Sequence, residues 1–95
     1  MITLIDIDAY VLKAEVEGEV VFIHMDYKFD TFTKSIYKEL LVQWEIILEE
    51  LKEKGIKVVA TLIPESWEKT RKWQAMFGLI PSYVIEDKIL FRRDL

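Results

Sequence analysis

The chain has 95 residues, a length that suits one domain with a single hydrophobic core, so residues 1–95 are expected to fold as one unit. Its net charge is −4, from 13 basic and 17 acidic residues. The chain therefore lacks the excess of positive charge that is usual in proteins that bind nucleic acid. The absence of cysteine excludes disulfides, thiolate catalysis and cysteine-ligated metals. No apolar run is long enough to cross a membrane and no signal-peptide pattern begins the chain, so a cytoplasmic location and no membrane partner are expected.

The first third of the chain is rich in strand-forming residues. Strands are expected at 2–7, 10–16 and 20–27, with a hairpin turn around Gly18, because glycine tolerates the positive φ of a tight turn. The continuous β-branched and aromatic run from Val20 to Ile23 is typical of a strand that is covered on both faces.

A long amphipathic helix is predicted at about 31–54. Asp30 or Thr31 supplies a candidate N-cap oxygen, and Gly55 supplies a stop that can take the left-handed conformation. The apolar residues recur at spacings of three and four and form one stripe that predicts a core-facing surface: Ile36, Leu40, Trp44, Ile47, Leu48 and Leu51.

The last third alternates strand, helix and hairpin. A strand at 56–63 ends at Pro64, Ser66 is a candidate cap for a second helix that Gly78 closes, and a hairpin follows with strands at 83–85 and 88–91. A strand, a long helix and another strand form a βαβ unit, which predicts parallel pairing of strands 20–27 and 56–63. The expected fold is therefore α/β (α+β), with a mixed, mostly antiparallel sheet around a central parallel unit and the order β(β)β-α-β-α-ββ.

Two segments resemble the GNAT (Gcn5-related) N-acetyltransferases. Residues 14–21, Ala-Glu-Val-Glu-Gly-Glu-Val-Val, resemble the family's hairpin with glycine in the turn. Residues 71–80, Arg-Lys-Trp-Gln-Ala-Met-Phe-Gly-Leu-Ile, resemble its basic, aromatic helix that ends at a glycine before a strand. The whole chain can be aligned with the fold from its third strand onward, and its spacing is similar to short, divergent copies carried by tailed bacteriophages.

The chain departs from the family at the turn that binds the coenzyme pyrophosphate. Members have a Gln/Arg-x-x-Gly-x-Gly/Ala turn before the long helix, where free backbone N–H groups meet phosphate. Here residues 26–33 contain no glycine. Phe29 and Phe32 would obstruct the backbone's approach to phosphate, and Asp26 and Asp30 would repel it. The family's frequent asparagine falls roughly at Trp67, and its proton-donating tyrosine falls at about Gln74.

His24 and Asp26 are the candidate proton-transfer pair, because residues two apart on a strand share a face. The alternative interpretation is a partly exposed strand histidine bonded to a neighbour. One histidine with scattered carboxylates gives no metal-site spacing, so no metal is expected. The basic, aromatic segment around Trp67 and Trp73 is either a contact for an anion or acidic partner, or a solvated face with one tryptophan packed on the sheet.

Two functional hypotheses follow from this resemblance. The first is a divergent, non-catalytic GNAT-like domain that acts through protein contact, as a phage accessory or virion-associated protein, in the host cytoplasm or the virion. It requires no cofactor. The second is a small acetyl-CoA-dependent N-acetyltransferase, in which the backbone of Ile23, His24 and Met25 would hold the coenzyme's pantetheine arm. The hydrophobic fraction of 52% and the off-stripe aromatics Phe29, Phe32 and Trp67 also predict a homodimer or a larger protein partner.

Overall fold

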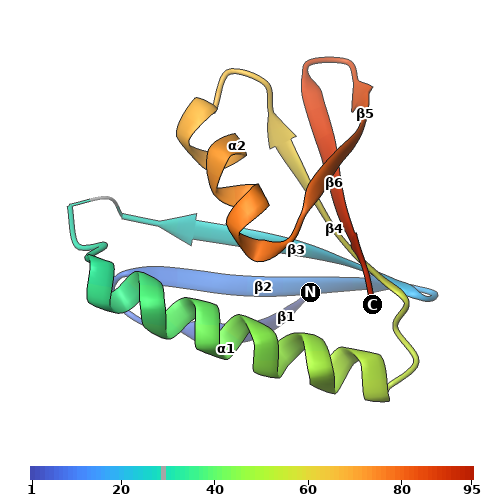
Figure 1. Ribbon diagram of the computed structural model, residues 1–95, viewed down its shortest axis with the longest axis horizontal. Helices are drawn as coiled ribbons and strands as arrows, with labels where there is room; N and C mark the ends of the chain where they lie inside the picture. The colour runs from blue at the N-terminus through green and yellow to red at the C-terminus, as the bar shows by residue number, and fades with distance from the viewer. Residues whose placement is uncertain (29) are drawn as a thin grey trace.

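A computed structural model describes residues 1–28 and 30–95 of the chain. These residues form six strands and two α-helices, in the order that the sequence predicts (Figure 1). The elements are β1 Ile2–Asp6, β2 Tyr10–Glu17, β3 Val20–Tyr27, α1 Lys34–Glu53, β4 Val58–Pro64, α2 Glu68–Gln74, the 3₁₀ turn η1 Ala75–Phe77, β5 Ile80–Ile85 and β6 Lys88–Asp94. The mixed α/β fold class and the element order are thus confirmed.

The six strands form one sheet in the order β1-β2-β3-β4-β6-β5. All neighbours are antiparallel except β3 and β4, which are parallel, with α1 between them in the chain, as the βαβ pattern predicts. Alternation along the strands divides the sheet into two faces. On β2, for example, Tyr10, Leu12 and Ala14 are buried, and they pair with Tyr27, Met25 and Ile23 of β3.

Helix α1 begins three residues later than predicted. Thr33 is its N-cap, and the hydroxyl Oγ1 of Thr33 accepts a hydrogen bond from the backbone N–H of Ile36 at 3.3 Å. The expected cap at Asp30 or Thr31 is wrong, because Thr31 Oγ1 instead donates to the carbonyl of Lys28 within the preceding turn. The stripe is confirmed as core, since Leu40, Trp44 and Leu48 are buried and the rest of the stripe packs against them. Within the described residues, no helix is long and apolar enough to cross a membrane.

Helix α2 lacks the predicted serine cap. Its N-cap position is taken by Trp67, whose side chain makes no capping bond, because the turn closed by Trp67 N–H on the carbonyl of Pro64 places Ser66 one residue too early. The end of the helix agrees with the sequence. Residues 75–77 tighten into a 3₁₀ turn, and Gly78 follows in the left-handed conformation at φ 76°.

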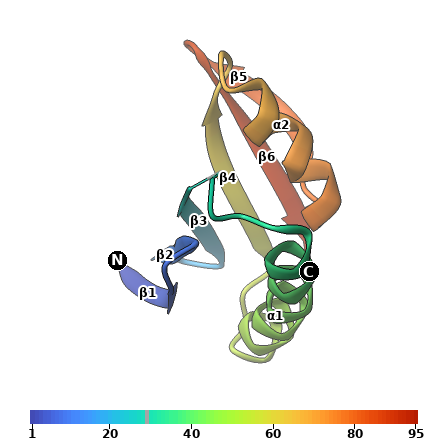
Figure 2. The ribbon, with the colours of Figure 1, turned by 90° about the vertical axis from the view of Figure 1, so that its left-hand side faces the viewer.

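Both helices lie on the same side of the sheet, as Figure 2 shows. The expectation that residues 20–23 are covered on both faces is therefore wrong. Val21 and Ile23 are buried beneath the helices, whereas Val20 and Phe22 are only half-buried on the other face. Strand β1 does not fold over that face, because it pairs with β2 at the edge of the sheet.

Candidate functional site

Strands β3 and β4 separate shortly after they begin. Their parallel register covers only Val20–Val58, Val21–Val59 and Phe22–Ala60. Beyond these pairs, β3 continues along β2 and β4 continues along β6, and Figure 1 shows the two strands diverging. Side chains of α2 occupy the widening space between them. We call this region, between the far half of β3 and helix α2, the interstrand site.

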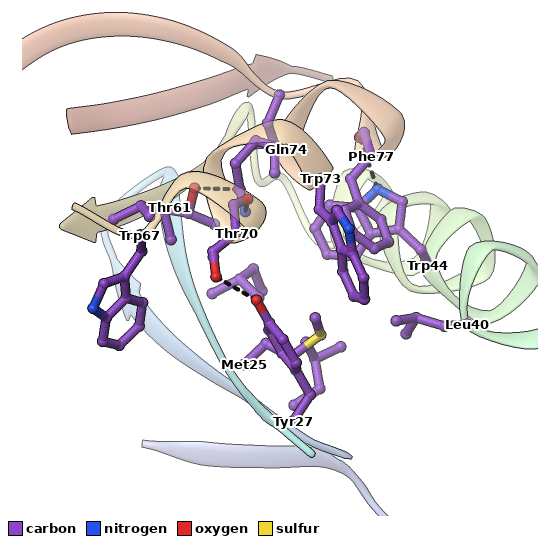
Figure 3. Close-up of a pocket in the computed structure, with 14 residues that line it drawn as sticks. Met25, Tyr27, Leu40, Trp44, Thr61, Trp67, Thr70, Trp73, Gln74 and Phe77 are labelled. Atoms are coloured by element: carbon purple, nitrogen blue, oxygen red, sulfur yellow. Dashed lines mark hydrogen bonds between the residues drawn. The ribbon is translucent and has the colours of Figure 1, made fainter. Parts of the chain in front are cut away.

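A small cavity and an open groove lie at the interstrand site. The cavity, of about 50 Å³, is lined mainly by apolar side chains of β3, α1 and α2, including Met25, Leu40 and Trp73 (Figure 3). The groove, of about 540 Å³, runs between residues 25–27 of β3 and residues 66–70 at the start of α2. Trp67 lies at this groove and is 55% exposed, so its indole is accessible to a ligand or partner.

A hydrogen bond connects the two sides of the site. The hydroxyl groups of Tyr27 on β3 and Thr70 on α2 are directly bonded, as Figure 3 shows. Trp73, one helical turn further along α2, stacks on the Tyr27 ring with centroids 5.1 Å apart and planes 17° apart. The two contacts bring α2 close against the far end of β3.

Trp73 is also at the centre of an aromatic cluster with Tyr27, Phe32 and Tyr37. The ring centroid of Trp73 lies 4.9 Å from that of Phe32 and 5.7 Å from that of Tyr37. Phe32 comes from the turn before α1 and Tyr37 from the helix's first turns. The cluster therefore fills the space between the start of α1, the end of β3 and α2. These rings pack within the chain, so Phe32 is half-buried by residues of its own chain, and the predicted homodimer or larger partner stays a prediction.

The turn before α1 has few of the features that bind a phosphate group. Phe32 packs inward in the aromatic cluster, and the carboxylates of Asp26 and Asp30 are exposed nearby. Phe29, the other residue expected to obstruct phosphate, lies outside the described residues. Two cations, Lys34 and Lys38, border a second open groove of about 530 Å³ on the α1 side of Trp73. A ligand anion would meet these ammonium groups rather than glycine backbone.

The two candidate proton-transfer residues lie in different surroundings. His24 and Asp26 do share the exposed face of β3. His24 Nε2 lies 3.6 Å from Glu15 Oε2 on β2, in agreement with the interpretation of a strand histidine bonded to a neighbour. Asp26 borders the groove, whereas His24 is not among the described residues that line it.

The three residues expected to hold a pantetheine arm lie where β3 leaves β4. The last β3 residue paired with β4 is Phe22, so Ile23, His24 and Met25 occupy the first positions past the parallel pairing. Ile23 and Met25 direct their side chains into the cavity. This stretch is the part of β3 where a ligand could pair with backbone groups that no longer face β4.

The side chain of Gln74 has a structural role. The residue is 6% exposed; its Oε1 accepts a 2.7 Å hydrogen bond from Thr61 Oγ1, and its Nε2 donates to the Thr70 carbonyl at 3.0 Å. Each end of the amide thus has a partner on β4 or α2. The side chain ties the middle of β4 to the end of α2 and has no ionisable proton to give.

Comparison with solved structures identifies the architecture. The PaiA N-acetyltransferase of Thermoplasma acidophilum, solved with coenzyme A, superposes with a TM-score of 0.75 at 15% identity, over 92% of this chain and 54% of that one. The chain has a GNAT-like acetyltransferase fold. A Bacillus subtilis acetyltransferase solved with CoA gives 0.69 at 16% identity, over 98% and 74% of the two chains. A GNAT-family acetyltransferase of Listeria monocytogenes gives 0.65 at 12%, over 92% and 58%.

No protein-family model matches the sequence, and no curated protein is found to be similar to it. The chain spans about half the length of the Thermoplasma enzyme. The similarity is therefore one of backbone arrangement, and the chemistry must be argued from the side chains at the interstrand site.

Burial raises the pKa of two tyrosine side chains in or next to the aromatic cluster. The pKa of Tyr10 is raised by its burial and, secondarily, by the negative charge of Glu39. Burial also raises the pKa of Tyr37 in the aromatic cluster. Both side chains therefore stay protonated at neutral pH. Within the described residues, no group of three or more histidine and carboxylate side chains is arranged to hold a metal ion.

Sequence reasoning missed Tyr27 and Thr70 as site residues. Tyr27 shares the inward face of β3 with Ile23 and Met25, and this period of two is a signal that could have placed it at the cavity. Thr70 precedes Trp73 by three residues, so both lie on one side of α2. Their contact with β3 depends on how α2 packs on the sheet, which no local pattern specifies.

Proposed function

We propose that this GNAT-like domain does not transfer acetyl groups and acts through contact with another protein. The observation that carries the proposal is the aromatic cluster, in which Trp73 stacks on Tyr27 and packs against Phe32. The role implied by the resemblance to short copies in tailed bacteriophages, an accessory or virion-associated protein, is part of this proposal.

By the resemblance, a coenzyme pyrophosphate would lie at the turn before α1, and the aromatic cluster packs beside that turn. A phosphate group binds well at a helix start only when backbone N–H groups are accessible. At α1 the first turn is preceded by the packed ring of Phe32, and Thr33 already caps the Ile36 N–H. The exposed carboxylates of Asp26 and Asp30 add repulsion toward a pyrophosphate.

The residues around the cavity offer little for acid–base catalysis. Its polar side chains are hydroxyls, an amide and three indoles, and the amide of Gln74 is fully engaged with Thr61 and Thr70. A proton donor for a departing thiolate needs an ionisable group of suitable pKa within hydrogen-bond reach. Tyr27, the phenol in the cavity, is bonded to Thr70.

A titration with acetyl-CoA tests the proposal. We expect no saturable heat from the unmodified protein at millimolar coenzyme. Trp73→Leu, which opens the aromatic cluster, should gain weak binding, whereas Trp67→Leu, which changes the exposed tryptophan, should not. Far-UV circular dichroism verifies that both variants remain folded. A dissociation constant in the low micromolar range for the unmodified protein overturns the non-catalytic function.

The second candidate function is a small acetyl-CoA-dependent N-acetyltransferase. The divergence of β3 and β4 after Phe22 favours it, because Ile23, His24 and Met25 stand at the positions where a pantetheine arm would pair with the strand. Two of the solved structures with this fold contain coenzyme A.

Kinetics with single variants test this second function. Release of free CoA thiol in the presence of a panel of primary amines would reveal turnover. If His24 and Asp26 carry proton transfer, His24→Gln and Asp26→Asn should each reduce kcat by roughly 100-fold or more, while Lys13→Gln, opposite His24 on β2, should leave it unchanged. Equal rates in all variants would exclude the pair.

A further inference from the structure

Strand β5 is an unprotected edge of the sheet. It is the last strand in the sheet order, so one side of its backbone faces no neighbouring strand within the described residues. All six of its residues, 80–85, are exposed. None of them is charged, and the largest are apolar: Ile80, Tyr83, Val84 and Ile85.

The opposite edge of the sheet carries a charge as well as an irregular pairing. Strand β1 ends in the charged residue Asp6, and its pairing with β2 is irregular between Thr3 and Ile5. Charges, prolines and irregular pairing are the usual devices that prevent an edge strand from pairing with another chain. On β5 these devices are Pro81 and an irregular pairing with β6 between Pro81 and Tyr83, both near its start, whereas the stretch from Tyr83 to Ile85 pairs regularly with β6 and carries no charge.

We propose that β5 is a homodimer interface, in which the β5 strands of two copies pair antiparallel about a two-fold axis. Such pairing would satisfy the outward backbone groups of both strands and continue the sheet from one copy to the other. It would also shield apolar side chains on both faces. Tyr83 and Ile85 share the uncovered face with Leu90, whereas Val84 shares the helix-covered face with Ile89.

The distribution of charge favours a second copy in this orientation. Because β5 itself carries no charge, two copies place no like charges opposite each other. The acidic turn Glu86-Asp87 follows the end of β5, and at the other end Arg92 on β6, which pairs with Ile80, is already neutralised by Asp94 at 2.6 Å. Antiparallel pairing sets the two acidic turns at opposite ends of the interface, whereas parallel pairing would set them side by side.

The dimer is independent of the proposed function, because β5 contributes no residue to the interstrand site. The result of the acetyl-CoA titration therefore does not bear on the dimer. In the same way, finding a monomer would not decide whether the domain is catalytic. Light scattering on a sizing column at tens of micromolar protein should give about twice the chain mass of 11.3 kDa. A mass of one chain up to about a hundred micromolar overturns the dimer.

A matched pair of substitutions locates the interface. Val84 on β5 is 60% exposed and Val42 on α1 is 61% exposed, so Lys in place of either should be tolerated by the fold. Val84→Lys should weaken dimerisation by at least roughly tenfold, because it puts a cation in the strand pairing. Val42→Lys should leave the mass unchanged. A dimer unaffected by a folded Val84→Lys overturns β5 as its interface.

A second matched pair gives another test if Val84→Lys does not fold. Ile85→Lys on β5, at a residue 47% exposed, should weaken the dimer, and Ile46→Lys on α1, at a residue 48% exposed, should leave it intact. Hydrogen exchange of the unmodified protein supplies the backbone readout. Amides of residues 82–85 that do not bond to β6 should exchange more slowly at high protein concentration than at low concentration. An equal rate at both concentrations, in a protein shown to dimerise, rules out β5 pairing.

Discussion

The Trp44 indole donates its Nε1 proton to the Phe77 carbonyl at 2.9 Å, and the two rings pack edge to face with centroids 5.4 Å apart. Both residues are buried. The same carbonyl accepts a second hydrogen bond from Arg93 Nη1, also at 2.9 Å. Three elements, α1, η1 and β6, therefore meet at one backbone oxygen.

Trp44→Ala should lower the free energy of unfolding by about 3–5 kcal/mol, because it removes a fully buried indole and leaves a cavity. Trp44→Phe keeps most of the packing and removes only the hydrogen bond to Phe77, so it should lose far less, on the order of 1 kcal/mol. Urea denaturation followed by circular dichroism measures both. A loss below about 1 kcal/mol for Trp44→Ala would show that the indole contributes little to the core.

Gly78→Ala should destabilise the protein more than Gly18→Ala. Both glycines have positive φ, 76° and 63°, so alanine at either position costs roughly 1–2 kcal/mol of backbone strain. At Gly78 a new Cβ would also lie 2.9 Å from Arg93 Nη1, whereas at Gly18 no atom lies within 4 Å. Arg93 would have to move away from Phe77 and Glu45. Equal midpoints of thermal unfolding in the two variants would contradict this role of Arg93.

Stability should fall at alkaline pH. The folded-state pKa values of Tyr10 and Tyr37 are raised above the ordinary value of 10.0, mainly by burial. Above about pH 10 the unfolded chain releases these phenolic protons first, so the free energy of unfolding decreases as pH rises. Below pH 9 this contribution is fully present. Urea midpoints between pH 8 and 11 measure the effect, and Tyr10→Phe should make the alkaline decline shallower. A steeper decline in Tyr10→Phe would rule Tyr10 out as a source.

Local patterns were sufficient to predict most of the fold. The 20–27 strand, the glycine-centred hairpin and the Gly78 stop depend on residue type and near neighbours, and the structure has all three. The start of α1 was predicted too early because Asp30, Thr31 and Thr33 are all good caps. The structure uses Thr33 as the cap, and the residue before it, Phe32, packs on Trp73 in a tertiary contact.

The candidate site was less predictable than the fold. Strand alternation correctly placed His24 and Asp26 on one face of the strand, which the structure shows to be exposed, with Ile23 and Met25 on the opposite face. The aromatic cluster was not predicted, because it joins Tyr27 to Trp73, which lie about half of the chain's length apart in the sequence. Such a contact is fixed by how α2 packs against β3, and periodicity within either element carries no information about that packing.

The short parallel register between β3 and β4 has a consequence for cooperativity. Among the described residues, backbone pairing between the two halves of the sheet is confined to the start of β3 and β4, where Val20–Phe22 pair with Val58–Ala60 and the Glu19 carbonyl accepts from the N–H groups of Lys57 and Val58. Away from them, side chains make the connection: Tyr27 to Thr70, Trp44 to Phe77, and Glu45 to Arg93. Partial unfolding would therefore separate the chain near residue 57 into two foldons, a β1–β3 meander with its helix and a β4–β6 unit with α2.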